Sequence, residues 1–202
     1  MAFALHTGVA AQDTNDGPTA SQIAAARNQA DRVVEAAKAA DVFENATVTD
    51  IPAVRHRQSG LRCLLIGDQG ADSLRADPVP GLPRGDDVSC ASYLGPLEFT
   101  LYFTRYPDQP SAEDDMDLAV GAILRRLPDA KPHTGELPIA SSDLGEPLWA
   151  GFDIVVSGRE MFTFVAVQKH GPWMVKVRAT GPRNEAEAIS TLASLLVVRA
   201  PD

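Results

Sequence analysis

Three apolar stretches separated by two short turns make up residues 152–180 of this chain. The stretches cover residues 152–157, 161–169 and 173–180, and each of the two turns between them contains a glycine. Turns of this length and composition join neighbouring antiparallel strands. The segment therefore predicts a three-stranded antiparallel meander, which is the strongest constraint that the sequence places on the fold.

A further strand and three helices are predicted around the meander. Residues 97–104 alternate between apolar and polar side chains, which is the period of a strand with one buried face. Residues 21–40 are rich in good helix formers, and residues 111–127 carry apolar side chains at helical spacing behind a serine N-cap. The last helix is expected to begin at Asn184, with Glu187 as its N3 partner in a capping box.

The order of these elements predicts an α+β fold in which helices pack on an antiparallel sheet. We expect residues 1–20 to be a flexible lead-in and residues 21–202 to form one domain, since the chain has an ordinary domain length. Residues 97–127 and 152–198 contain hairpin strands and a closing helix. They also contain a mid-chain helix, which follows a strand that ends in an aromatic-Pro step. In this order of elements the chain resembles the Mog1/PsbP-like fold, a resemblance of topology that implies nothing about function.

Cys63 and Cys90 are the only cysteines, and each lies in a strand-like apolar run. Their spacing does not fit a metal site of the C-x-x-C kind. In an exported protein the pair predicts a disulfide, whereas in a cytosolic protein it predicts two buried thiols. We expect a disulfide that joins two neighbouring strands and tethers the Pro- and Gly-rich loop of residues 67–87. Such a bridge would stabilise the fold by about 3.5 kcal/mol at most.

The first residues carry a second indication of export. Residues 2–11 are apolar except at His6 and Thr7, and residues 9–12 are similar to a signal-peptidase site. The stretch is short and lacks basic residues, so we expect Met1 to lie inside a longer secretory precursor whose mature chain begins near the end of this stretch. An ordinary frayed terminus is the alternative. The predicted location is periplasmic or secreted, with the cytoplasm as the alternative.

Net charge and the length of the apolar runs exclude two classes of function. A net charge of −9 repels nucleic acid at long range. No run approaches the roughly 20 apolar residues that a membrane-spanning helix needs. We therefore expect no nucleic-acid partner and no transmembrane segment.

No motif in the chain specifies a reaction, a cofactor or a metal. The serine-nucleophile motifs G-x-S-x-G and helical S-x-x-K are missing, and so are the glycine-rich phosphate loops. His56 and His133 could act as general bases, but neither has a companion in the sequence. His56 lies between two arginines, which predicts a solvated basic face and a lowered pKa for His56. We predict no cofactor and no bound metal; catalysis stays undecided, and a non-catalytic role is favoured.

One face of the last predicted strand carries two cations on an acidic protein. Lys176 and Arg178 share this face, and Tyr102 joins them if its strand is a neighbour in register. The candidate ligand-binding residues are Tyr102, Trp173, Lys176 and Arg178, for an anionic or amphipathic ligand. A solvated sheet face is the alternative.

The sequence supports three hypotheses about function. The first is an exported, non-catalytic module of a bacterial-type envelope that binds a protein or a small ligand. The second is a carrier that holds an apolar or amphipathic ligand between helix and sheet, in a cavity lined by Trp149, Phe152, Phe162, Phe164 and Trp173. The third is a hydrolase whose site is assembled from distant loops, with His56 or His133 beside a carboxylate.

Overall fold

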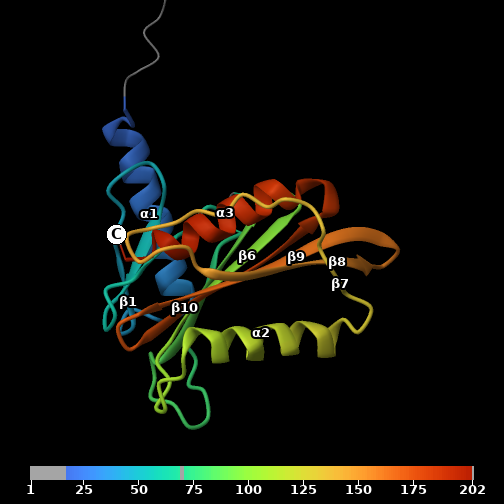
Figure 1. Cartoon of the computed structure of the whole chain (residues 1–202). Coiled ribbons are helices and arrows are strands. Elements are labelled where there is room, and N and C mark those ends of the chain that lie inside the picture. Colours follow the sequence, from blue (N-terminus) through green and yellow to red (C-terminus); the bar gives the residue numbers. More distant parts are fainter. Residues whose placement is uncertain (1–16, 69–70, 202) are drawn as a thin grey trace, which may run out of the picture.

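The computed structural model describes residues 17–68 and 71–201 (Figure 1). These residues form two antiparallel sheets and three α-helices, so the predicted α+β class is confirmed. Residues 1–16, which hold the predicted signal remnant and most of the predicted lead-in, lie outside the described residues. That residues 21–202 form one domain stays a prediction. The topological resemblance to the Mog1/PsbP-like fold also stays a prediction.

The larger sheet has seven strands in the order β4-β5-β6-β10-β9-β8-β7. Its strands are β4 (Ser73–Arg75), β5 (Asp87–Leu94), β6 (Leu97–Thr104), β7 (Lys131–Pro132), β8 (Leu148–Val156), β9 (Arg159–His170) and β10 (Trp173–Pro182). β8, β9 and β10 form the predicted meander, and β6 pairs antiparallel with β10. This pairing brings two segments that are far apart in the sequence into one surface.

The smaller sheet consists of β1 (Phe43–Asn45), β2 (Ala53–His56) and β3 (Arg62–Leu64). The sequence predicts an irregular edge strand or extended arm over residues 43–59 and a buried strand over residues 61–66. The structure shows that these segments pair with one another instead of joining the larger sheet. Short connections separate them, and consecutive strands with short connections usually pair with each other.

Two of the three helices begin with a capping box. α1 (Ala20–Ala36) is capped by Thr19 together with Gln22, and α2 (Ala112–Arg126) is capped by Ser111 together with Asp114. α2 ends just before Pro128, which disfavours helical backbone in the residue that precedes it. The serine N-cap that the sequence predicts for α2 is therefore confirmed.

The predicted start of the last helix at Asn184 is wrong. A 3-10 turn, Arg183–Glu185, precedes α3 (Ala186–Val198), and no side chain caps either element. The reason lies in β10, which pairs with β9 as far as Pro182, so the chain needs one tight turn to leave the sheet before the helix can begin.

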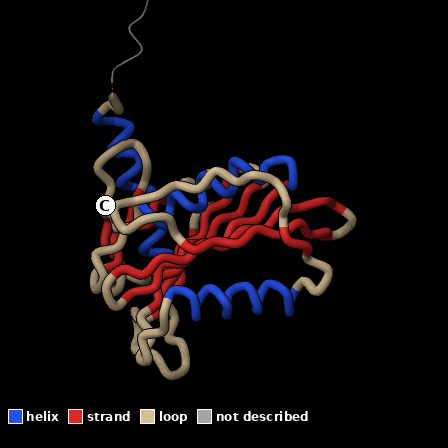
Figure 2. The backbone as a smooth tube through the Cα atoms, viewed as in Figure 1, coloured by secondary structure: helices blue, strands red, loops and turns tan. Residues whose placement is uncertain are grey.

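The helices cover the two faces of the larger sheet differently (Figures 1 and 2). α3 and α1 close the main core on one face, here called the α3 face, and α2 packs on the other, here called the α2 face. β9 is buried on both faces, which explains its nearly continuous apolar sequence. β6 alternates, and its side chains in the core of the α3 face are Leu97, Phe99, Leu101 and Phe103.

A disulfide joins Cys63 on β3 to Cys90 on β5, with 27 residues of separation and a Cα–Cα distance of 6.5 Å. The predicted disulfide is therefore confirmed. The prediction that it joins two neighbouring strands is wrong, because β3 and β5 belong to different sheets. The bridge thus ties the smaller sheet to the larger one, and both half-cystines lie in the main core.

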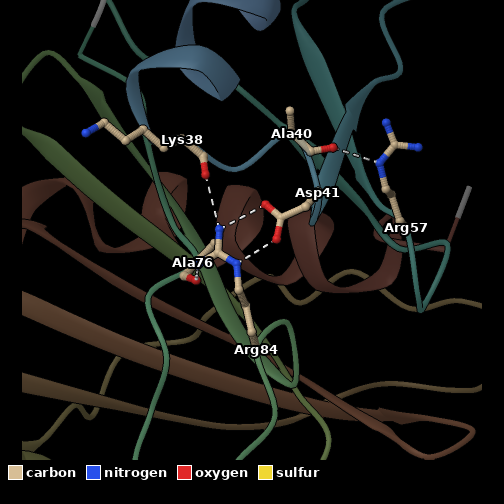
Figure 3. A network of polar contacts seen from close by, with 6 residues as sticks. All are labelled: Lys38, Ala40, Asp41, Arg57, Ala76 and Arg84. Atoms are coloured by element: carbon tan, nitrogen blue, oxygen red, sulfur yellow. Dashed lines mark hydrogen bonds and ion pairs between the residues drawn. The ribbon is translucent and has the colours of Figure 1, made fainter.

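The segment between the two cysteines is not a free loop. It contains β4, which pairs with β5 and forms one end of the larger sheet. Arg84 anchors the remainder: its guanidinium bonds both carboxylate oxygens of Asp41 at 2.7 and 2.9 Å (Figure 3). The same group donates to the backbone carbonyls of Lys38 and Ala76. Arg84 therefore holds this segment against the end of α1.

Within the described residues, no helix combines the length and the apolar character that crossing a membrane requires.

Candidate functional site: the α2 groove

Pairing of β6 with β10 assembles three of the four predicted ligand-binding residues. Tyr102 lies directly opposite Lys176, and Thr100 lies directly opposite Arg178. Side chains in register on adjacent strands point to the same face of a sheet, so Tyr102, Lys176 and Arg178 share the α2 face.

The fourth predicted residue, Trp173, lies elsewhere. Its side chain points to the α3 face, is 5% exposed, and makes an edge contact with His56 at a ring distance of 4.9 Å. The guanidinium of Arg105 lies over the indole, 5.4 Å from its centre. Trp173 is therefore a core residue and not part of the surface that carries Lys176 and Arg178.

Two adjoining cavities of about 310 and 370 Å³ lie between α2 and the sheet, and we call them together the α2 groove. α2 packs on β8 and β9, which leaves the surface of β6 and β10 partly uncovered. Tyr102 and Arg178 line both cavities. The other charged residues of the lining are Arg75, Asp87, Glu98, Asp115, Arg126 and Lys176.

Lys176 is not a free cation. Its Nζ atom lies 3.1 Å from both carboxylate oxygens of Asp115 on α2. Asp115 is 1% exposed, and it also accepts a hydrogen bond of 2.7 Å from the hydroxyl of Tyr106. Burial, together with this acceptor, raises the pKa of Tyr106, so its hydroxyl remains a donor. Lys176 thus serves to attach α2 to the sheet.

Two cations of the groove, Arg178 and the exposed Arg126, form no ion pair within the described residues, and Arg178 is the more buried of the two. Its side chain is half-buried, and it forms no ion pair with any carboxylate in residues 17–68 and 71–201. Burial lowers the pKa of Arg178, and the nearby positive charge of Arg126 lowers it further. An arginine remains protonated despite such a shift. Tyr102 and Glu98 act on the pKa in the opposite direction, but Glu98 does not come within ion-pair distance of Arg178. The groove therefore contains a partly desolvated positive charge with no directly paired carboxylate among the described residues.

The net charge of the groove lining is positive, opposite in sign to the net charge of the whole protein. Four cations and three carboxylates line it, although the chain carries a net charge of −9. Arg75 is paired with Asp87 at 2.8 Å, and Lys176 is paired with Asp115. The excess positive charge therefore lies at Arg178 and Arg126.

Sequence reasoning missed several residues of the groove. Arg75 and Asp87 fall within residues 67–87, which were expected to form a loop, and Asp115 in the first turn of α2 was not among the predicted site residues. The helical period of α2 was a usable signal, because Asp115 is on the same side as the buried Ala119 and Met116. A carboxylate on the buried side of an amphipathic helix requires a partner on the surface below it.

His56 does not lie on a solvated basic face, so that prediction is wrong. The side chain is completely buried among the rings of Phe43, Phe103 and Trp173. Its pKa is lowered to about 4, and the main cause is burial, not the flanking arginines. Nδ1 bonds Ser59 Oγ at 2.8 Å, whereas Nε2 is buried and faces the backbone of Gly85. Such a closed environment offers no access to a substrate.

His133 is the histidine that the structure places beside a carboxylate. Its Nδ1 lies 2.7 Å from Asp153 Oδ1, and Arg183 binds the other oxygen of Asp153 at 3.0 Å. Although burial raises the pKa of Asp153, the hydrogen bonds from His133 and Arg183 lower it overall. His133 lines a cavity of about 510 Å³, but the side chains described around that cavity include no serine, threonine or cysteine nucleophile.

The aromatic residues proposed to line a carrier cavity do not face one another across a single space. Phe162 and Phe164 pack in the core of the α3 face, whereas Phe152 packs beneath α2. Trp149 is 39% exposed and stacks on Phe164 with 6.1 Å between ring centres. The buried rings fill the interior on opposite sides of the sheet and Trp149 lies partly at the surface, so the carrier hypothesis loses the cavity on which it depended.

The described residues contain no group of three or more His, Cys, Asp and Glu side chains that could hold a metal ion.

Comparison with known proteins adds little to this picture. No protein-family model matches the chain, and no curated protein sequence matches it. Among solved structures, the chain is similar to LpqN, described as a protein involved in cell envelope biogenesis of Mycobacterium tuberculosis, over 66% of this chain and 84% of that chain. The sequence identity is 14% and the TM-score is 0.36, so this similarity carries no argument about function.

Proposed function

We propose that this protein is an exported, non-catalytic binding module that takes an anionic or amphipathic ligand in the α2 groove. The observation that carries the proposal is the half-buried Arg178, which lines both cavities and has no ion pair within the described residues. A partly desolvated guanidinium gains most from a ligand that supplies the missing acceptor oxygens, since hydrogen bonds between charged groups are the strong ones.

The lining of the groove supports an amphipathic ligand. Leu118 borders one cavity and Val156 borders the other, and their side chains are 62% and 43% exposed. Apolar contact area next to a convergent cation is typical of small-molecule sites. An anionic group at Arg178 with an apolar part toward Leu118 or Val156 would use both features.

The disulfide supports the exported part of the proposal. Disulfides such as Cys63–Cys90 form and persist in oxidising compartments and are rare in the reducing cytosol. A periplasmic or secreted location is therefore proposed for the chain. Expression with cellular fractionation tests it, and recovery of the protein in the cytosol with two free thiols would contradict it.

Binding of the anionic, apolar fluorophore 8-anilinonaphthalene-1-sulfonate tests the ligand site directly. We expect Arg178→Glu to weaken binding at least about tenfold, the equivalent of a charged hydrogen bond. Arg159→Glu makes the same charge change at an exposed position in the β8–β9 hairpin and should leave binding within about twofold. Equal affinity of the two variants would overturn the proposal, and native mass spectrometry of protein from its own source would then be the way to find the ligand.

The His133–Asp153 pair supports a second candidate, a hydrolase in which His133 activates water. The pair has the hydrogen bond of a general base with its orienting carboxylate, at 2.7 Å. Nitrophenyl ester and phosphate substrates test this function with His133→Ala as the control. Turnover that disappears in the variant would favour the hydrolase over the binding module, and the proposed function predicts none.

A further inference from the structure

A cavity of about 730 Å³ lies between α1 and β4, away from the α2 groove. α1 contributes one wall and β4, with the residue before it, contributes the other. The residues that line it are Gln29, Arg32, Val33, Ala36, Ala37, Asp72, Ser73 and Leu74.

β4 is the last strand at its end of the larger sheet. One edge of Ser73–Arg75 pairs with β5, and no strand within the described residues pairs with the other edge. An unpaired strand edge presents backbone N–H and C=O groups that can accept an additional strand. Here the free edge borders the cavity, so a segment lying in the cavity could reach these groups.

Polar bridges tie α1 to the β4 segment at both ends of the cavity. At one end Gln29 Nε2 donates to Asp72 Oδ2 at 3.0 Å. At the other end Arg84 donates to the carbonyls of Lys38, just after α1, and Ala76, just after β4 (Figure 3). The two walls are therefore held at a set distance, and the cavity is not merely a gap between loosely docked elements.

The carboxylate in the lining is already satisfied. Asp72 is 8% exposed and accepts hydrogen bonds from Gln29, from the Gly67 backbone N–H and from the Ser92 hydroxyl. Arg32, in contrast, is exposed and forms no ion pair within the described part of the chain. The free charge of this cavity is therefore positive, and Val33 and Leu74 provide apolar surface beside it.

From these features we propose that the cavity is a docking site for an extended, acidic peptide segment of a partner protein. The segment adds to the free edge of β4 as an additional strand. An apolar side chain packs against Val33 and Leu74, and an acidic residue pairs with Arg32. Main-chain hydrogen bonds to the edge supply the affinity and the two walls supply the specificity, which is the mode of β-strand addition.

The test is a titration of the isotope-labelled full chain with the peptide acetyl-Thr-Val-Glu-Val-Thr-amide, followed by amide NMR. We expect shifts confined to residues 72–76 and to α1 from Gln29 to Ala37, with a Kd of about 1 mM or tighter, because only three residues of β4 can pair. The same peptide with N-methylated backbone amides keeps its side chains but cannot form a strand. It should fail to bind.

Two variants separate the site from the rest of the surface. Ala36→Phe fills the cavity and should weaken binding at least about tenfold, whereas Ala25→Phe, at another exposed position of α1, should leave it unchanged. Arg32→Glu should abolish the preference for glutamate over lysine at the centre of the peptide. No shift at millimolar peptide, equal binding of the N-methylated peptide, or shifts centred on Tyr102 and Arg178 would each overturn the proposal.

Discussion

The two faces of β6 have opposite surroundings although their residues alternate along one strand. On the α3 face, Phe103 is completely buried in a core closed by α3, α1 and the smaller sheet. On the α2 face, the adjacent Tyr102 is half-buried and lines both cavities of the α2 groove. The difference arises because α2 packs on β8 and β9, so that β6 and β10 are left partly open.

The comparison teaches where stability and binding reside in this fold. The α3 face holds the disulfide and the largest buried side chains, so substitutions there should cost stability. The open part of the α2 face holds the charges of the α2 groove, so most substitutions that line the groove should change binding more than folding. Residues of the two faces that are neighbours in the sequence offer matched tests.

The largest expected effect comes from Phe103→Ala, which should lower the free energy of unfolding by about 3–5 kcal/mol because it leaves a cavity in a close-packed core. Tyr102→Ala, one residue away, should cost less than about 1 kcal/mol because the side chain borders open space. Chemical denaturation of both variants measures the difference. Equal losses would show that the two faces are packed alike.

Removal of the disulfide should come next in size. Cys63→Ala with Cys90→Ala is expected to cost about 3.5 kcal/mol or less, because the closed loop of this length no longer restricts the unfolded chain. For a protein of this size the melting temperature should fall by roughly 2–4 °C for each kcal/mol lost. Thermal unfolding in oxidising and reducing buffer gives the same comparison in the native sequence. An unchanged melting temperature would contradict a structural role for the bridge.

Acid should weaken the α3 face through His56. Burial holds the pKa of His56 near 4 in the folded protein, below the ordinary value of 6.5, with Asp86 and Arg105 as the charged groups that act on it. The neutral form is favoured in the fold, so its contribution is fully present above pH 6.5 and is lost as the pH falls from 6.5 toward 4. We expect a loss of roughly 3 kcal/mol across this window.

The matched control for this acid effect is His56→Phe, which keeps an aromatic ring but removes the titrating group. Denaturation at pH 7, 5.5 and 4.5 should give a smaller pH dependence for the variant than for the unmodified protein. The same slope in both proteins would assign the acid sensitivity to other groups.

The smallest expected changes in stability come from substitutions of two cations on the α2 face. Lys176→Met leaves Asp115 buried with a partner missing, which should cost about 1–3 kcal/mol. Arg178→Met removes no ion pair and should change stability by less than about 0.5 kcal/mol, while it weakens binding of anions in the groove. A stability loss of equal size in both variants would show that Arg178 is also structural.

Much of the local structure could be predicted from the sequence because it depends on short-range interactions. The alternation of residues 97–104 and the turns of the meander correspond to β6, β8, β9 and β10 in the structure. The serine cap of α2 was also recognisable, because its acceptor and donor lie three residues apart. Because side chains alternate between the two faces of a strand, Trp173 and Lys176 must point to opposite faces. The prediction that both bind the ligand overlooked this signal.

Long-range contacts were beyond such reasoning. The apolar run around Cys63 does not by itself show whether this strand pairs with β2 or joins β5 in one sheet. The short connection to β2 favours the observed pairing, but the predicted disulfide was taken to mean that Cys63 and Cys90 lie on neighbouring strands. The two arginines that flank His56 in the sequence indicate an exposed position, and they do not show that three aromatic rings pack around its side chain. The match of Lys176 with Asp115 joins residues 61 positions apart and depends on where α2 docks.

The sequence alone thus determined the α+β class, strands β6, β8, β9 and β10, the three helices apart from their exact ends, and the disulfide expected of an exported chain. The tertiary structure decided that the strands divide into two sheets, that one face of β6 is closed and the other open, and that Arg178 rather than Lys176 is the unpaired cation. The physical reason is that periodicity, turns and caps act within a few residues, whereas burial and charge pairing depend on which distant surfaces meet.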